Sequence, residues 1–290
     1  MSAFPGTRTE RLNKTSLFGV GFVLGEYAKT YPDEVVCIPR NDIIAPTNNI
    51  LYGISTIHNY HPKDGDPHID IQTNLVHFMN VLDANINEES VFNLISTWFV
   101  YGKTQIPAQE DSPCNPTGFY SITARAREQL LISYCETFGL KYRILMLCNV
   151  IGIGDQKASP KKNALQWMTR ELAQGRNLRV YNNNPVRDYM DVRDCVRAIH
   201  LILEKGKLNE IYNVSNGQGE SVRGLVEHAA EFSAHKGNVG SMNVPEFHST
   251  VQTGSIYLDN SKLRALGYVQ QHDIRTTIGE LVKYYEQNEN

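Results

Sequence analysis

The stretch SITARAREQLLISYCETFGLKYRILMLCNV (Ser121–Val150) contains a predicted helix followed directly by a predicted strand. The helix, residues 121–139, ends at Gly139, a residue that often closes helices because it adopts a left-handed backbone without strain. The strand YRILMLCNV (142–150) is almost continuously apolar, which is typical of a strand buried on both faces of a parallel sheet. Parallel strands need such crossover helices between them. The stretch therefore predicts an α/β fold.

The same alternation of strand and helix continues toward the N-terminus. Helices are predicted over residues 22–31 and 69–85, the second with apolar side chains at three- and four-residue spacing. This order predicts a doubly wound parallel sheet, which binds ligands at the carboxyl ends of its strands. The further predicted strands are EVVCIP (34–39), NILYGIS (49–55) and SVFNLIS (90–96).

Beyond residue 155 the alternation becomes less regular, which indicates a second, smaller unit. We expect a lead-in of residues 1–14 and a dinucleotide-binding domain of residues 15–155. Residues 156–290 are expected to form mainly a substrate-binding cap interleaved with the sheet. The helix predicted over residues 193–206 is expected to pack back on the first domain.

The composition is that of an ordinary soluble globular chain. Of the 290 residues, 41% are hydrophobic and 20% charged, and the net charge of −3 argues against a nucleic-acid partner. The five cysteines form no C-x-x-C pair, which favours a reducing compartment. No apolar run approaches the ~18 residues of a membrane span, and the N-terminus lacks the apolar segment of a secretory signal. We expect a cytoplasmic protein with no membrane partner.

A glycine-rich turn precedes the first predicted helix. The segment SLFGVGFVLGEYA contains Gly19, Gly21 and Gly25, whose backbone N–H groups can approach a pyrophosphate at a helix N-terminus. The spacing is one residue longer than the usual G-x-G-x-x-G, and a glycine-rich turn without a ligand is an equal alternative. Arg40 follows the next strand, where it would meet a ribose 2′-phosphate or lie exposed in a loop. Ser55, at the end of the following apolar run, is assigned to the same cofactor.

Six segments in order resemble the extended short-chain dehydrogenase/reductase family, in its nucleotide-sugar epimerase/dehydratase branch. The resemblance implies a Rossmann-like sheet, NAD or NADP as cofactor, a nucleotide-diphosphate sugar as substrate, and a homodimer formed through helices 69–85 and 120–139. The segments are STWFVYG (96–102), PTGFYSITA (116–124), NVIGIGD (149–155), RDYMDVRDCVRAI (187–199), IYNVSNG (211–217) and LDNSKLRALGY (258–268).

The resemblance assigns catalysis to Tyr120, with Thr97 as the hydroxyl that hydrogen-bonds the reacting oxygen. A tyrosine has a pKa of about 10 and needs a nearby positive charge to act near neutrality. The family places a lysine four residues later, on the same helix face, where this chain has Ala124. Arg125 is turned about 100° further around the helix and is not an easy replacement. Impaired turnover is therefore expected, and Ala124→Lys is expected to raise it.

The resemblance also bears on the reaction and the substrate. Nucleotide-sugar 4,6-dehydratases of the family carry an Asp-Glu pair directly after the threonine, and Trp98 and Phe99 at these positions cannot transfer a proton. An epimerase or ketoreductase is therefore expected. Asn149 is predicted to contact the sugar nucleotide, and Arg187 to bind its diphosphate, unless Arg187 instead pairs with Asp188.

Several departures from the family leave a second hypothesis open. Met146 stands where relatives often carry arginine, and Asp191 and Arg193 replace the usual histidine and aspartate. Only about nine residues separate strands 34–39 and 49–55, too few for the usual helix and strand, so the sheet is expected to be one strand short. The alternative is an inactive relative that binds nucleotide sugar or cofactor, or acts as a scaffold.

Histidines near residue 60 give only a weak metal signal. HNYH (58–61) and His68 lack acidic or cysteine partners at ligand spacing, so no metal is expected. These residues are predicted to line the mouth of the cofactor cleft instead. Cys148 lies inside an apolar strand and is predicted to be a core residue rather than a nucleophile.

Overall fold

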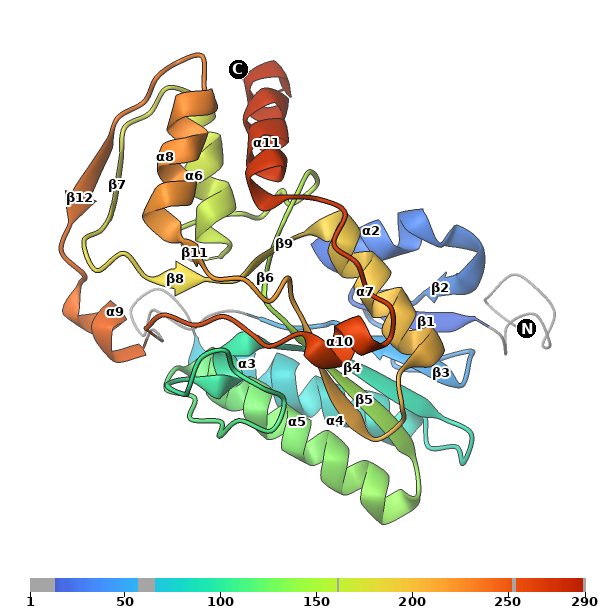
Figure 1. Ribbon diagram of the computed structural model, residues 1–290. Coiled ribbons are helices and arrows are strands. Elements are labelled where there is room, and N and C mark those ends of the chain that lie inside the picture. The colour runs from blue at the N-terminus through green and yellow to red at the C-terminus, as the bar shows by residue number, and fades with distance from the viewer. Residues whose placement is uncertain (1–13, 57–65, 161, 252–253, 289–290) are drawn as a thin grey trace.

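A six-stranded, all-parallel sheet runs through the centre of the computed structural model, which describes residues 14–56, 66–160, 162–251 and 254–288 (Figure 1). Its strand order is β10-β5-β4-β3-β1-β2, and the predicted α/β fold with a doubly wound sheet is confirmed. The strands are β1 (Thr15–Phe18), β2 (Val35–Cys37), β3 (Asn49–Tyr52), β4 (Val91–Thr97), β5 (Lys141–Leu147) and β10 (Glu210–Val214).

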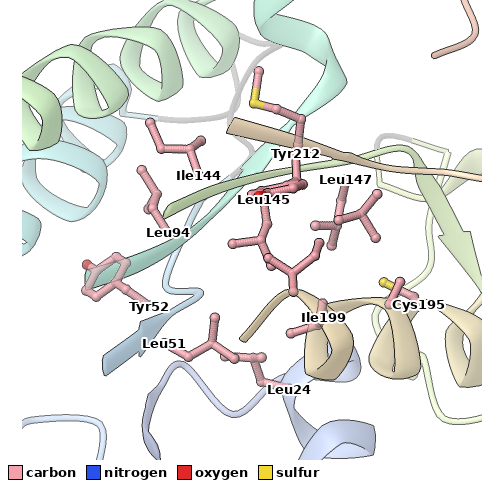
Figure 2. Packing of buried hydrophobic residues seen from close by; sticks show 14 of the residues in the cluster. Leu24, Leu51, Tyr52, Leu94, Ile144, Leu145, Leu147, Cys195, Ile199 and Tyr212 are labelled. Atoms are coloured by element: carbon pink, nitrogen blue, oxygen red, sulfur yellow. The ribbon is translucent and has the colours of Figure 1, made fainter. Parts of the chain in front are cut away.

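Helices cover both faces of this sheet. Figure 1 shows α4 and α5 on one face and α2 and α7 on the other. Buried side chains of α2, α7 and the strands form one continuous hydrophobic cluster, part of which is drawn in Figure 2. These elements are α2 (Phe22–Thr30), α3 (Pro67–Ile71), the π-helical turn η2 (Gln72–Val76), α4 (His77–Ala84), α5 (Phe119–Phe138) and α7 (Val192–Lys205), with the 3-10 turns η1 (Pro32–Glu34) and η3 (Trp98–Tyr101).

Strand β2 connects to β3 without a helix, as its short connection predicts. Residues 38–48 contain neither helix nor strand, and β1 pairs directly with both β2 and β3. The predicted strand 142–150 is in fact two strands. Strand β5 ends at Leu147, and residues 149–151 form β6, which pairs with β9 outside the central sheet. The helix predicted over residues 69–85 is also divided, because its middle turn is π-helical.

A second hydrophobic cluster lies in the C-terminal half. It is formed mainly by buried side chains of α6, α8 and α11, with β7 beside them. Strand β10 and helix α10 nevertheless return to the first cluster, so the domain boundary at residue 155 stays a prediction. The elements are β6 (Asn149–Ile151), α6 (Ala164–Ala173), β7 (Leu178–Tyr181), β8 (Val186–Arg187), β9 (Tyr189–Asp191), β11 (Glu220–Ser221), α8 (Val222–Phe232), β12 (Val239–Met242), α9 (Glu246–Val251), α10 (Ser261–Ala265) and α11 (Ile274–Asn288).

Asp191 connects the two clusters. It caps α7 by accepting a hydrogen bond from the Arg193 backbone N–H at 2.7 Å. Its carboxylate also accepts from the Arg193 side chain at 2.7 Å and from the Thr277 hydroxyl of α11 at 2.7 Å. Asp191 and Arg193, which the sequence shows only as departures from the family, therefore form a structural network. Within the described residues, no helix has the length and apolar character needed to cross a membrane.

Candidate active site

Three side chains predicted for the site meet at the carboxyl edge of the central sheet. Strands β3 and β4 are parallel neighbours, so Ser55, just beyond β3, and Thr97, the last residue of β4, lie at the same edge. Helix α5 begins here, and its second residue is Tyr120. The hydroxyls of Thr97 and Ser55 both hydrogen-bond to the Tyr120 phenol. Ser55, predicted at the cofactor, thus contacts the predicted catalytic tyrosine.

The surroundings of Tyr120 both oppose and support its ionisation. The Phe99 ring packs edge-on against the Tyr120 ring, with centroids 6.0 Å apart. Burial raises the pKa of Tyr120 above its usual value. The positive charge of Arg127 is the largest influence in the other direction, followed by the hydroxyls of Thr97 and Ser55. The charge that most favours ionisation of Tyr120 is therefore that of Arg127, which the sequence analysis did not single out.

Arg127 is buried beneath this edge of the sheet, with 1% of its surface exposed. Its guanidinium donates to the backbone oxygen of Ile54 at 2.7 Å and to that of Ile95 at 3.2 Å. The rings of Tyr52 and Phe78 each lie with their centroid 5.9 Å from the guanidinium carbon. The signal that would have revealed Arg127 is its spacing, because seven residues are almost two helical turns and return to the face of Tyr120.

Ala124 and Arg125 lie as the sequence suggested. Ala124, in the family's lysine position, is fully buried in the first hydrophobic cluster. Arg125 faces elsewhere, and its guanidinium pairs with Glu128 at 3.0 Å. The Glu128 carboxylate, itself buried, also accepts a short hydrogen bond from Ser96. Arg125 is therefore engaged by its own carboxylate partner.

A buried polar network holds the loop that carries Ser55. The Thr56 hydroxyl donates to the buried carboxylate of Asp70, and the Thr56 backbone N–H donates to the Asn74 side-chain oxygen at 3.0 Å. Asn74 also donates to the Thr123 hydroxyl of α5 at 3.0 Å. Because Asn74 lies in the π-helical turn, the irregularity of this helix serves the site. The sequence reasoning read the segment as a regular helix and missed both Asp70 and Asn74.

The three predicted glycines differ in whether the structure leaves room for a side chain at their positions. Gly19 has a φ of +87°, and a Cβ there would meet the backbone nitrogen of Ile54 at 2.8 Å, so only glycine fits this crossing. Gly21 is the N-cap residue of α2, and as a glycine it gives the helix start no side-chain cap. A Cβ on Gly25, inside α2, would meet nothing within 4 Å. The turn at Gly19 and Gly21 could hold a pyrophosphate, whereas Gly25 has no packing reason to be glycine.

Arg40 lies in an exposed turn beyond β2 and makes no hydrogen bond or ion pair with another described residue. Its side chain could reach a ribose phosphate or remain in solvent, so both readings of the sequence stay open. The open start of α2 at Gly21 and the row of hydroxyls at the sheet edge fit a dinucleotide laid along that edge.

The two predicted substrate residues are held by backbone groups. The Asn149 side-chain amide donates to the Asp188 backbone oxygen at 2.9 Å. The Arg187 guanidinium donates to the backbone oxygens of Val186 and Gly254 and lies 5.2 Å from the Trp98 ring centroid. That contact places Arg187 beside the strand end that carries Thr97.

The Asp188 carboxylate accepts hydrogen bonds from the backbone N–H groups of Asn216 and Leu258, each at 3.2 Å. Burial raises the pKa of Asp188 to about 7. Asp188 is therefore occupied by the loops that follow β10 and precede α10, rather than being a carboxylate reserved for Arg187.

The histidine segment contributes little that can be described. HNYH (58–61) lies outside the described residues, and His68 is exposed near the start of α3. Within the described part of the chain, no three histidine, cysteine, aspartate or glutamate side chains come together as metal ligands. Cys148 is buried in the first hydrophobic cluster, and burial raises the pKa of its thiol; a buried core cysteine was predicted.

A family model matches the middle of the chain, which contains Ser55, Thr97, Tyr120, Asn149 and Arg187. Residues 54–215 match the model described as NAD dependent epimerase/dehydratase family. A GDP-6-deoxy-D-mannose reductase of Pseudomonas aeruginosa is 28% identical over 175 residues, which cover 58% of this chain and 58% of the reductase. The aligned part of the chain thus spans well under two thirds of this relative's length.

Solved structures resemble the whole chain. A UDP-glucose 4-epimerase from Thermotoga maritima, determined with UDP-glucose, superimposes with a TM-score of 0.84 at 19% identity, covering 96% of this chain and 100% of the epimerase. RMD from Pseudomonas aeruginosa, complexed with NADPH, has a TM-score of 0.81 at 20% identity, covering 95% and 99% of the two chains. At these identities the likeness establishes the fold.

Proposed function

The chain belongs to the NAD dependent epimerase/dehydratase family, and on this premise we propose that it is an NAD(P)-dependent nucleotide-sugar epimerase or ketoreductase. The observation that carries the proposal is the Tyr120 phenol, held by the hydroxyls of Thr97 and Ser55 at the carboxyl edge of the sheet. The Gly19–Gly21 turn supports a dinucleotide along the same edge. The relatives support both cofactors, since the family is described as NAD dependent and RMD was solved with NADPH.

Tyr120 is the proton acceptor and donor in this proposal. A nicotinamide cofactor, when bound, accepts or returns the hydride at the sugar carbon. In the oxidation direction the Tyr120 oxygen takes the proton of the sugar hydroxyl, and in reduction it returns a proton to the carbonyl oxygen. Thr97 and Ser55 orient the phenol and donate hydrogen bonds to its ionised form. Both directions therefore use the same three hydroxyl groups.

The two positions that carry the Asp-Glu pair of the family's dehydratases hold no proton-transfer group in this chain. Trp98 and Phe99 follow Thr97 directly and stack on one another with centroids 3.9 Å apart. Trp98 is buried, and the Arg187 guanidinium lies over its ring. An apolar pair at these positions can shape a sugar pocket but cannot eliminate water, so epimerisation or ketone reduction is favoured.

The nucleotide-diphosphate sugar is proposed to lie near Arg187 and Asn149. Arg187 stands beside Trp98, so a sugar that reaches Tyr120 would bring its phosphates toward this guanidinium. The UDP-glucose bound by the Thermotoga maritima epimerase supports this substrate class. The nucleotide base and the sugar configuration are left to a panel of UDP-, GDP-, CDP- and dTDP-sugars.

The second candidate is a binding or scaffolding protein without turnover. Ala124 favours it, because the family's lysine is absent from a fully buried position. Calorimetric titration with NAD, NADH, NADP and NADPH, followed by product analysis on the sugar panel, separates the two candidates. Binding of a dinucleotide with turnover supports the enzyme. Binding without turnover supports the second candidate, and no dinucleotide binding at millimolar concentration contradicts the enzyme.

We propose that the protein pairs with a second copy through the helical segment of α3, η2 and α4 together with α5. Helix α5 exposes Ile122 and Leu130, and Val76 is exposed at the end of η2 beside it. Exposed apolar side chains on adjacent helices are typical of a buried interface. The Ile122→Glu/Leu130→Glu double variant is expected to convert a dimer into a folded monomer in size-exclusion chromatography with light scattering. Val269→Glu, at an exposed apolar residue beyond α10, is the control and should leave the dimer intact. A monomeric native protein would contradict the pairing.

A further inference from the structure

Arg127 is a buried cation that the proposed mechanism has not yet used. Within the described residues it forms no ion pair and its Nε has no hydrogen-bond partner. Its guanidinium donates to two backbone oxygens and lies near two aromatic rings. Burying a charge without a carboxylate partner costs free energy that structure alone seldom repays. Such an unpaired cation therefore points to a function.

The position of the guanidinium links it to Tyr120. One acceptor is the Ile54 backbone oxygen, immediately before Ser55, and the other is the Ile95 backbone oxygen, two residues before Thr97. Arg127 thus spans the two strand ends whose hydroxyls hydrogen-bond to the Tyr120 phenol. One side chain fixes both supports of the phenol and brings a positive charge beneath it.

Helix geometry explains how the side chain of residue 127 reaches the region of Tyr120. A residue seven positions after Tyr120 lies within about 20° of it around the helix, and one four positions after lies within about 40°. Helical side chains lean toward the N-terminus, so a long side chain at position 127 extends back over the turn that contains Ala124. A small residue at 124 leaves room for that path, and both Ala124 and Arg127 are buried. The two residues are complementary.

We propose that Arg127 supplies, from one turn further along α5, the fixed positive charge that the family's lysine would supply from position 124. This inference rests on the proposed function, because it gives Tyr120 the cation its chemistry needs. The site is then rearranged rather than disabled. Arg127 is a positioning residue that acts through Tyr120, and Ala124→Lys alone is now expected to give no gain, since it would place two cations in a site built for one.

The charges around the phenol decide the expected direction. Burial raises the pKa of Tyr120, Arg127 lowers it, and the Asp70 carboxylate of α3 raises it. Around the guanidinium stand Tyr52 of β3 and Glu128 of α5, and Glu128 is already bound by Arg125 and Ser96. Removing the Arg127 charge leaves only the Thr97 and Ser55 hydroxyls to oppose burial and Asp70, so the phenol should become harder to ionise.

The test uses the ligand-free protein, so it needs neither cofactor nor substrate. Tyrosines are replaced biosynthetically by 3,5-difluorotyrosine, which ionises nearer neutrality, and ¹⁹F NMR follows each residue with pH. The Tyr120 resonance is assigned by its loss in Tyr120→Phe. In Arg127→Gln, which keeps a hydrogen-bond donor but not the charge, the Tyr120 titration should move upward by about one pH unit or more. Ala124→Lys in the Arg127→Gln background should move it back.

Arg125→Gln is the matched control, because it removes the neighbouring cation of the same helix and should leave the Tyr120 titration in place. If Arg127→Gln does not fold, Arg127→Lys and the Ala124→Lys/Arg127→Met double variant retain a charge and must titrate like the native protein. An unshifted Tyr120 titration in folded Arg127→Gln would overturn the inference, and so would failure of lysine at position 124 to reverse the shift. Either result would mean that Arg127 only holds the two strand ends in place.

Activity gives an independent arm. On the sugar identified by the panel, Arg127→Gln should lower kcat at pH 7 by about 10- to 100-fold. The pH at which kcat rises as Tyr120 ionises should also increase, by the same amount as the pH of the NMR titration. A protein that binds no dinucleotide yet shows the NMR shift would contradict the proposed function and keep the Arg127 assignment. A protein that binds a dinucleotide and turns over the sugar, but shows no NMR shift in Arg127→Gln, would support the proposed function and contradict the role of Arg127.

Discussion

Tyr120→Phe is expected to lower kcat by about 1,000-fold on the nucleotide sugar that the native protein converts, because general acid–base catalysis by one side chain contributes about 100- to 10,000-fold. The substitution removes only the phenol oxygen, to which the hydroxyls of Thr97 and Ser55 hydrogen-bond. The ring and its edge-on contact with Phe99 remain. Hydride transfer would then have no group to take or return the proton.

Two measurements make this expectation specific to proton transfer. Calorimetric affinity for the cofactor should change little in Tyr120→Phe, so a lost turnover cannot be assigned to an empty site. Tyr134→Phe is the matched control, since Tyr134 lies on the same helix but hydrogen-bonds to Asp83 at 2.5 Å, far along α5 from its start. Its kcat should stay within about twofold of the native value. If Tyr120→Phe kept a tenth of native activity, another group would be the proton carrier.

The fold was largely predictable because its central strands are buried runs of apolar residues separated by helices. Strand β1 was not among the predicted strands, since Thr15 and Ser16 make its sequence look polar. In the structure both side chains are buried, and each is satisfied by a distant partner, Ser16 by Thr47 at 2.6 Å and Thr15 by Asn49 at 2.8 Å. Hydrogen bonds to side chains that are distant in the sequence thus replace apolar character, and such partners cannot be predicted from a local pattern.

The site was predictable at positions where this chain carries the same residue as the family. It was not predictable where the chain carries a different residue. Thr97 and Tyr120 stand at those positions, and the structure brings them together. Attention to position 124 and its nearest cation led to Arg125, which instead pairs with Glu128. Arg127 was missed because the three-to-four spacing rule must be applied twice to connect it with Tyr120. Asp70 was missed because its role depends on a loop that folds back to it.

Asp191→Ala is expected to lower the free energy of unfolding by about 3 kcal/mol at pH 7, from loss of a helix cap together with buried hydrogen bonds to a charged group. Asp191 is fully buried, begins α7 of the first hydrophobic cluster, and accepts a hydrogen bond from Thr277 of α11 in the second. Its loss should therefore also loosen the coupling between the two clusters, visible as a broader urea transition. Arg193 is partly exposed and can be solvated, which limits the cost.

The pH dependence of that loss identifies the ionised carboxylate as its source. Burial opposes ionisation of Asp191, but the hydrogen bonds from Arg193 and Thr277 outweigh it and lower the pKa of Asp191. A lowered folded-state pKa gives stability that is complete above the unfolded pKa of about 3.9 and is lost as the pH falls through the folded-state value. The difference in free energy of unfolding between the native protein and Asp191→Ala should thus be constant from pH 8 to 5 and become smaller below about pH 4.

Glu280→Ala gives the matched control for the Asp191 experiment. Glu280 pairs with Arg193 from the solvent side at 2.7 Å, and both side chains are about 40% exposed (40% and 42%). Exposed ion pairs contribute about 0–1 kcal/mol, so urea unfolding of Glu280→Ala should differ little from that of the native protein. Equal losses from the two variants, or a gap for Asp191→Ala that persists to pH 3, would mean that Arg193 rather than the buried carboxylate holds α7 to α11. The junction between the clusters would then depend on the exposed Arg193–Glu280 ion pair together with apolar packing.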